Sequence, residues 1–138
     1  MCPETKIIIA IGSNWSQQEN ISFAKKKLKL LLGDSVRFTT EKRTTAIGIE
    51  AEPFTNCICT ALTKHTMQQL EKAFKHIEKQ CFRTKKNNRL NRITLDIDIL
   101  QYGNERYHEN DWEREYIKVL MKEIENENDN IIIEPINN

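Results

Sequence analysis

The chain has 138 residues, enough for one domain with a sizeable hydrophobic core. Its 21 Lys and Arg residues nearly balance its 20 Asp and Glu residues, which excludes a polycation that binds nucleic acid through bulk charge. No stretch is long and apolar enough to cross a bilayer, the N-terminal apolar run makes a poor signal peptide, and the four cysteines show no disulfide or zinc spacing, so we expect a cytoplasmic protein with reduced thiols.

Hydrophobic periodicity predicts four strands and three helices along the chain. Apolar residues recur at helical spacing in three segments, and short apolar or alternating runs mark the strands. Gly33 ends the first helix, and Thr66 has the side chain of an N-cap for the second. The predicted elements are strand Lys6–Ile11, helix Ser16–Leu32, strand Val36–Arg43, strand Phe54–Thr63, helix Thr66–Lys79, strand Ile93–Gln101 and a short last helix to about Ile124.

The order β-α-β-β-α-β predicts an α+β fold of the ferredoxin-like type, in which two helices cover one face of an antiparallel four-stranded sheet. No internal repeat or linker divides the chain, so we expect a single domain over residues 1–138, with its core at about 6–124. The tail, residues 125–138, is expected to be mobile or packed at an edge. Whether Ile131–Ile133 pairs as an edge strand is left open.

The most informative stretch runs from Arg83 to Leu100. A segment rich in Arg and Lys, free of acids, leads into a strand that carries Asp96 and Asp98. Because a strand repeats every two residues, these carboxylates share one face, about 7 Å apart, opposite an aliphatic face. Each could reach one of a pair of Mg²⁺ ions, while the cationic segment binds phosphates. The stretch predicts a nucleotide phosphate site; the alternative is a solvent face that happens to carry two acids, beside a basic loop without a ligand.

Polar and aromatic residues elsewhere could complete such a site. His108 and Arg114 could add two cationic donors, and Phe54 and Tyr116 could sandwich a flat heterocycle whose edge Asn56 reads. The alternatives are a structural histidine and two core aromatics. RNA-recognition modules, which share the ferredoxin-like fold, stack bases on aromatics of their central strands. The predicted central strands offer only Phe54, so the RNA-binding alternative is weakly supported.

These residues resemble the 6-hydroxymethyl-7,8-dihydropterin pyrophosphokinase family of folate biosynthesis. The resemblance covers about residues 7–124, and its motifs are specific when taken together in this order. Its markers are Ile11–Asn14, Phe54–Asn56, Ile77–Glu78 followed by Arg83, Thr94–Leu100 and His108–Tyr116.

The resemblance implies transfer of the β,γ-diphosphate of ATP to the pterin's hydroxymethyl oxygen, with release of AMP, two Mg²⁺ ions and small-molecule substrates as the only partners. Carried over to this chain, Asp96 and Asp98 would hold the metals, and with Arg83 and Arg92 they would form the catalytic set. The nucleotide would be bound by Lys75, Glu78, Arg83, Lys85, Arg89, Arg92, Ile99, His108 and Arg114. The pterin would be bound by Thr44, Thr45, Ile47, Phe54, Asn56 and Tyr116.

Four features depart from the family pattern. Leu90 stands where the family usually has Trp, Lys85 stands where it has an arginine, and Arg92 stands one position before the family's arginine. The segment before His108 is also short and lacks the usual prolines. On a strand, a one-residue slip turns a side chain to the opposite face unless a bulge restores it. The rival hypothesis is therefore a catalytically weak relative that binds a pterin or a nucleotide, or acts through a partner. The sequence leaves the oligomeric state open.

Overall fold

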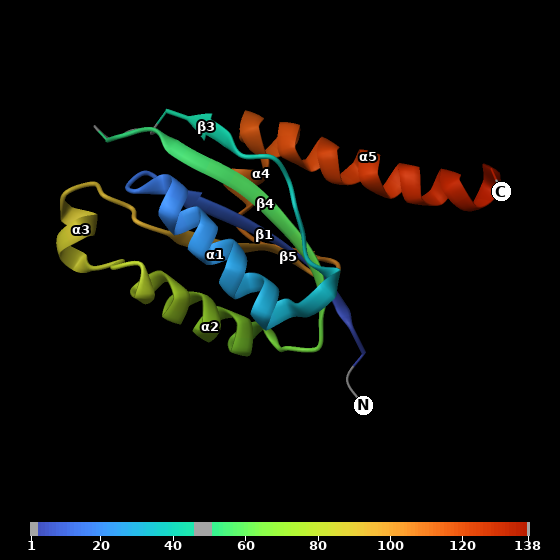
Figure 1. Ribbon diagram of the computed structural model, residues 1–138, viewed down its shortest axis with the longest axis horizontal. Helices are drawn as coiled ribbons and strands as arrows, with labels where there is room; N and C mark the ends of the chain where they lie inside the picture. The colour runs from blue at the N-terminus through green and yellow to red at the C-terminus, as the bar shows by residue number, and fades with distance from the viewer. Residues whose placement is uncertain (1–2, 46–50, 138) are drawn as a thin grey trace.

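The structure, a computed structural model, describes residues 3–45 and 51–137, and for residues 127–137 it describes the backbone alone. Figure 1 shows a central sheet with helices on both sides. The elements are β1 (Thr5–Ser13), α1 (Gln17–Leu32), the 3-10 turn η1 (Gly33–Ser35), β2 (Arg37–Phe38), β3 (Lys42–Thr44), β4 (Phe54–Thr63), α2 (Met67–Gln80), α3 (Lys85–Arg89), β5 (Asp96–Tyr102), β6 (Glu105–Arg106), α4 (Glu109–Trp112) and α5 (Glu115–Asn137).

All strand pairs of the sheet are antiparallel, and the strand order is β2-β4-β1-β5-β6, with β3 also pairing β4. This confirms the predicted mixed α+β class with an antiparallel sheet. The central strand β1 pairs with β4 on one side and with β5 on the other. In this register Gly12 lies between Asn56 and Asp96, so three residues far apart in the sequence meet at one end of the sheet.

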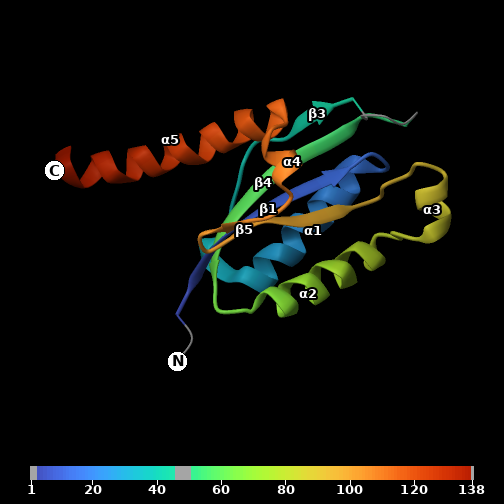
Figure 2. The same ribbon diagram turned by 180° about the vertical axis from the view of Figure 1, so that it is seen from behind.

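Both faces of the sheet are buried. Ile7, Ile9 and Ile11 of β1 pack against α1 and α2, whereas Ile8 faces the other way. Figures 1 and 2 show α5 on the side of the sheet opposite α1 and α2. Burial on both faces explains why β1 is a nearly continuous apolar run rather than an alternating one. The hydrophobic cluster on the face that Ile8 points to consists of Ile8, Ile58, Leu100, Trp112, Ile117, Leu120 and Ile124.

The C-terminal helix is longer than expected. The sequence predicted a short helix, but α5 spans 23 residues, and its first half covers the second apolar face of the sheet. The backbone of Ile131–Ile133 continues this helix, so this run does not form an edge strand. Within the described part of the chain, no helix has the combination of length and apolar character needed to cross a membrane.

The predicted strand Val36–Arg43 is interrupted between β2 and β3. At the break, the Thr39 backbone N–H donates to Ile58 O at 2.8 Å, and the Thr39 hydroxyl accepts from Ile58 N at 2.8 Å. The carboxylate of Glu123 on α5 accepts from the backbone N–H and the hydroxyl of Thr40, at 2.9 and 2.7 Å. One backbone bond to β4 therefore persists at the break, while the side chains of Thr39 and Glu123 supply the other hydrogen bonds, which the apolar pattern did not reveal.

Two expectations around the basic segment were wrong. The segment is not all loop, because Thr84 caps the short helix α3 by accepting a hydrogen bond from Asn87 N at 3.1 Å. The following strand begins at Asp96 rather than Ile93. The backbone N–H and C=O of Ile93 bond instead to the Oδ1 and backbone N–H of Asn14, at 2.6 and 3.0 Å, in the turn after β1.

The cysteines that the structure describes are buried free thiols. Cys57 and Cys59 lie two residues apart on β4, and Cys81 follows α2. Burial raises the pKa of Cys57 to about 11 and that of Cys59 to about 12. Thiols that stay protonated are poor nucleophiles and poor metal ligands, so these three act as small core residues.

Candidate functional site

Asp96 and Asp98 lie on β5 at the boundary between two cavities and line both of them. The cavities have volumes of about 360 and 260 Å³. The expected alternation of β5 is confirmed, because Ile97 and Ile99 are buried in the core beneath α1 and α2 while both carboxylates are only half-buried. The two acids thus form one pair that faces two separate spaces.

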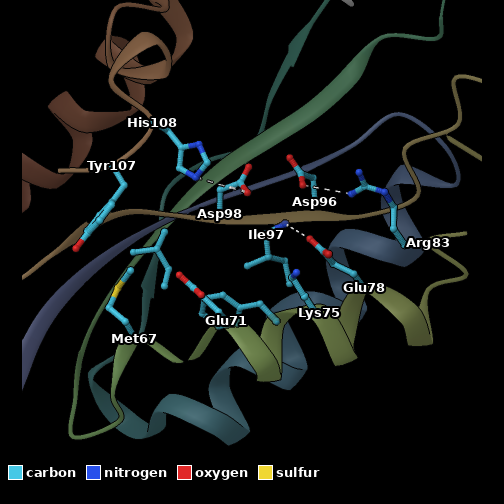
Figure 3. Close-up of a pocket in the computed structure, with 12 residues that line it drawn as sticks. Met67, Glu71, Lys75, Glu78, Arg83, Asp96, Ile97, Asp98, Tyr107 and His108 are labelled. Carbon is cyan, nitrogen blue, oxygen red and sulfur yellow. Dashed lines mark hydrogen bonds and ion pairs between the residues drawn. The ribbon is translucent and has the colours of Figure 1, made fainter. Parts of the chain in front are cut away.

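The larger cavity lies between α2 and β5. Within the part of the chain that the structure describes, no strand pairs with the outer edge of β5 here, since β6 pairs only with Gln101 and Tyr102. Glu78 of α2 occupies this edge and accepts a hydrogen bond from Ile97 N at 2.8 Å, at the peptide between the two acids. Figure 3 shows this bond beneath the acid pair.

Arg83 occupies the same edge of β5, one step further along. Its guanidinium donates to Leu95 O at 2.9 Å and forms an ion pair with Asp96 at 3.2 Å (Figure 3). Its Nε donates to Asn88 of α3 at 2.9 Å. Arg83 therefore links the acid pair to the basic segment that precedes it.

The short helix α4 is flanked by His108 and Arg114, which lie at the larger and the smaller cavity. His108 precedes it with a positive φ of 56°, and its Nε2 lies 4.0 Å from Asp98 in the larger cavity (Figure 3). Arg114 follows α4 and lines the smaller cavity, with its Nε bonded to Asp111 at 3.0 Å. The indole N–H of Trp112 donates to Leu100 O at 3.2 Å and Tyr107 O at 3.0 Å, which fixes α4 on the sheet.

The smaller cavity is a slot with aromatic and amide side chains in its wall. Phe54, Asn56 and Tyr116 line it, with Gly12 in the same wall. Asn56 uses its Nδ2 to donate to Thr44 Oγ1 at 2.8 Å and Lys42 O at 3.3 Å. A Cβ atom on Gly12 would lie 3.0 Å from Asn56 Oδ1, so a side chain there would crowd the amide oxygen that faces the slot.

The electrostatics of the acid pair favour a bound cation. Burial, then the hydrogen bond and charge of Asp96, raise the pKa of Asp98 to about 8. Burial is also the largest cause of the raised pKa of Glu78. Among residues 3–45 and 51–126, whose side chains are described, no cluster of three or more His, Cys, Asp or Glu could hold a metal by itself. Mg²⁺ is commonly bound by one or two carboxylates together with substrate phosphates, so this pair fits such an ion.

The structure brings most of the predicted residues to these two cavities. The larger cavity is lined by the nucleotide candidates Lys75, Glu78, Arg83, Ile99 and His108. The smaller cavity is lined by the pterin candidates Thr44, Thr45, Phe54, Asn56 and Tyr116, and also by Arg114, which the sequence assigned to the nucleotide. Lys85 and Arg89 of α3 line neither cavity. Ile47 lies outside the described residues.

Arg92 lines neither of the two cavities that Asp96 and Asp98 share. Its guanidinium sits 4.1 Å above the ring centroid of Trp15, and both residues line a third cavity of about 470 Å³ with Leu90. A one-residue slip would turn Arg92 to the opposite face only if Arg92 lay in a strand. β5 begins four residues later, so Arg92 is not part of it. The placement of Arg92 therefore reflects its contact with Trp15 rather than strand alternation.

Several residues that line the two cavities were not predicted from the sequence. Gly12 is recognisable only from the register of three strands. Asp111 lies between His108 and Arg114, and its spacing of three from Arg114 was the available signal. Glu71 of α2 and Tyr107 after β6 line the larger cavity. Glu71 precedes Lys75 by one helical turn, which could have placed it on the same face.

Comparison with protein families supports the resemblance. The family model described as 7,8-dihydro-6-hydroxymethylpterin-pyrophosphokinase (HPPK) matches residues 8–126, which is most of the chain. Comparison with curated proteins gives no match. The matched range includes every cavity-lining residue described above.

Proposed function

The chain belongs to the 7,8-dihydro-6-hydroxymethylpterin-pyrophosphokinase family, and from this premise we propose that it transfers the β,γ-diphosphate of ATP to the hydroxymethyl oxygen of the dihydropterin and releases AMP. The observation that carries the proposal is the acid pair shared by two cavities. A donor in one cavity and an acceptor in the other would meet across Asp96 and Asp98.

The smaller cavity suits the pterin. A pterin is flat, with amide and amine groups along one edge, and the slot offers the aromatic rings of Phe54 and Tyr116 and the amide of Asn56. The Nδ2 group of Asn56 is already engaged with Thr44, so its Oδ1 is oriented to accept a hydrogen bond from a ring N–H. In this pose the hydroxymethyl group would point toward the acid pair.

The larger cavity suits the nucleotide when cations accompany it. Its walls carry Lys75, Arg83 and His108, but also the carboxyl groups of Glu71, Glu78, Asp96 and Asp98, so bound cations would reduce the repulsion between these acids and a polyphosphate. We propose that Asp96 and Asp98 hold two Mg²⁺ ions together with the phosphates. The bound ions would neutralise charge on the phosphates and polarise their oxygens.

The protein's own contribution would be positioning and charge stabilisation. The slot orients the hydroxymethyl oxygen toward the β-phosphorus. As the new bond from this oxygen to the β-phosphorus forms, the bond from that phosphorus to the oxygen of the departing AMP breaks, and the hydroxyl proton passes to water. Arg83 lies beside Asp96, where its guanidinium can bind transferring phosphate oxygens. Arg114, held at its Nε by Asp111, presents its remaining amino groups on the pterin side.

The order of the main strands also supports the ferredoxin-like fold that we inferred from the sequence. With β2 and β3 counted as one interrupted strand, the sheet reads second, third, first and fourth strand across. Two helices, α1 and α2, follow the first and third of these strands.

A direct assay tests the proposed activity. The protein is incubated with ATP, Mg²⁺ and 6-hydroxymethyl-7,8-dihydropterin, and AMP and pterin diphosphate are quantified by chromatography. We expect the two products in equal amounts, and we expect Asp98→Ala to abolish both because one of the two cation-binding carboxylates is lost. Lys26→Ala, which alters an exposed residue of α1, is the matched control and should leave turnover unchanged.

The rival function is binding of a pterin or nucleotide without turnover. The position of Arg92 on Trp15, outside the lining of both cavities, favours this rival. Calorimetric titration with each substrate separates the two hypotheses: binding without formation of AMP or pterin diphosphate would replace the pyrophosphokinase proposal with the rival.

A further inference from the structure

The contact between Trp15 and Arg92 joins the turn after β1 to the segment before β5. The guanidinium carbon of Arg92 lies 4.1 Å from the ring centroid of Trp15, which is well inside the range of a cation–π contact. Trp15 is 40% exposed. Among residues 3–45 and 51–126, whose side chains are described, no acidic side chain forms an ion pair with Arg92. The guanidinium of Arg92 instead contacts the indole ring of Trp15.

The backbone on both sides of Arg92 is held by Asn14. The Asn14 side chain is buried, donates to Asn91 O at 2.8 Å and accepts from Ile93 N at 2.6 Å. The backbone N–H of Arg92 donates to Asn87 O of α3 at 2.8 Å. Because the backbone is fixed at these points, the guanidinium can leave Trp15 by rotation of its own side chain, without unfolding the segment.

Resting on the proposed function, we propose that Trp15 is a positioning residue for Arg92: its indole ring holds the guanidinium outside the nucleotide cavity until a Mg²⁺-bound polyphosphate draws it away. A cation–π contact at an exposed site is weak, whereas a guanidinium bonded to phosphate gains a charge-assisted hydrogen bond. The polyphosphate therefore wins the competition, and the ring imposes only a small penalty on nucleotide binding.

The contact between Trp15 and Arg92 lies at the third cavity. Trp15, Leu90 and Arg92 line it, and the side chains of Trp15 and Leu90 are 40% and 50% exposed. An exposed apolar surface of this kind gives the aliphatic and planar parts of Arg92 a place to pack. When Arg92 leaves, the indole ring gains exposure to water on that face.

Intrinsic fluorescence provides the first test. The chain has two tryptophans, and Trp112, the last residue of α4, is only 9% exposed. The purified protein is titrated with Mg²⁺ and the α,β-methylene analogue of ATP, which resists cleavage at the bond that the proposed reaction breaks. We expect a shift in emission in the wild-type protein, no such shift in Trp15→Phe, whose remaining signal comes from Trp112, and no such shift in Arg92→Ala, which leaves Trp15 in place.

Affinity for the same analogue provides the second test, measured by calorimetry. Trp15→Leu removes the ring that holds Arg92, so we expect binding to tighten about two- to five-fold. Trp15→Phe keeps an aromatic face and should lie between the wild-type protein and Trp15→Leu. In the Arg92→Ala background, Trp15→Leu should have no further effect, because the two residues act through one contact.

The possible outcomes separate this inference from the proposed function. An analogue that binds while the emission of Trp15 stays constant, or shifts equally in Arg92→Ala, overturns the role of Trp15 and leaves the pyrophosphokinase proposal standing. Unchanged affinity in Trp15→Leu also overturns it. An analogue that does not bind at all, together with absent turnover, overturns both.

Discussion

The fold favours the protonated form of Asp98, whereas binding of a cation requires the ionised form. Burial removes water from its carboxyl group, and Asp96 adds a hydrogen bond and a like charge, so its pKa rises to about 8. At neutral pH the ligand-free folded protein therefore holds Asp98 mainly protonated, whereas the unfolded chain ionises it, and this difference lowers the stability of the folded state. A divalent cation between the acids would reverse this balance, because it favours the ionised form of both.

The raised pKa of Asp98 predicts a pH-dependent effect of Asp98→Asn on stability. The pKa of Asp98 is about 8 in the folded protein and has its usual value of 3.8 in the unfolded chain, so the unfolded chain ionises more easily. The wild-type protein therefore loses stability as the pH rises from 3.8 to about 8. An asparagine side chain at this position cannot ionise. Without metal, Asp98→Asn should have little effect on Tm near pH 3.5 and raise Tm increasingly toward pH 8.

Calorimetric scans in the presence of a chelator test this prediction. The matched control is Asp34→Asn, which changes an exposed acid in the η1 turn and should show no such trend. A Tm difference for Asp98→Asn that is constant across the pH range would contradict the assigned cause.

Phe82 is an exposed residue in a strained backbone conformation. It follows α2 with a φ of 61°, and its side chain is 73% exposed. Its N–H donates to Lys79 O at 3.0 Å and the next N–H, of Arg83, donates to Glu78 O at 3.1 Å, which is the hydrogen bonding of a helix C-terminus that favours glycine. A side chain in this left-handed region costs about 1–2 kcal/mol.

Phe82→Gly should therefore stabilise the protein by about 1 kcal/mol, measured as the free energy of unfolding in urea. Phe82→Ala is the control, because it removes the ring but keeps the Cβ atom that causes the strain, and it should leave stability nearly unchanged. Equal stabilisation by both variants would assign the effect to the exposed ring rather than to the backbone.

The elements defined by local signals could be predicted from the sequence. β4 matches its predicted bounds, and α1 ends where Gly33 indicated. Thr66 caps α2 as expected, with Gln69 completing a reciprocal capping box at 3.2 and 2.9 Å. In each of these cases the information lies within a few residues of the boundary.

The elements that depend on distant partners could not be predicted in the same way. The side chain of Asn14 binds the backbone of Ile93, which therefore does not join β5. Glu123 stabilises the break between β2 and β3 by binding Thr40, and in both cases the two partners lie far apart in the sequence. The packing of the first half of α5 follows from the need to cover the second face of the sheet, which became evident only from the burial of Ile8 and Ile58.

Glu78 holds the acid-bearing strand from outside the sheet, and this predicts a difference between two substitutions. Glu78→Ala removes the acceptor for Ile97 N and should lower the free energy of unfolding by about 1–3 kcal/mol, because a partly buried N–H loses its partner. Glu78→Gln keeps an oxygen acceptor and should lose less. Urea denaturation measures both, and equal losses would show that the hydrogen bond is not the cause.

At the scale of the whole molecule, the candidate site lies where three strands meet at one end of the sheet. The sequence could identify the acid pair and most lining residues through their resemblance to a family. It could not place Gly12 beside Asn56 and Asp96, because that adjacency is a property of strand register. Nor could it place Arg92, whose position depends on a tryptophan 77 residues earlier that no periodic pattern connects to it.

The open border of β5 has a consequence for how molecules of this chain meet each other. A strand with unpaired N–H and C=O groups at its rim is a template on which another polypeptide can add itself, and this is a common route to aggregation. Here Leu95 O and Ile97 N are already bonded to Arg83 and Glu78, side chains that no incoming strand can easily displace. The residues that steady the acid pair therefore also protect the protein against self-association along this border.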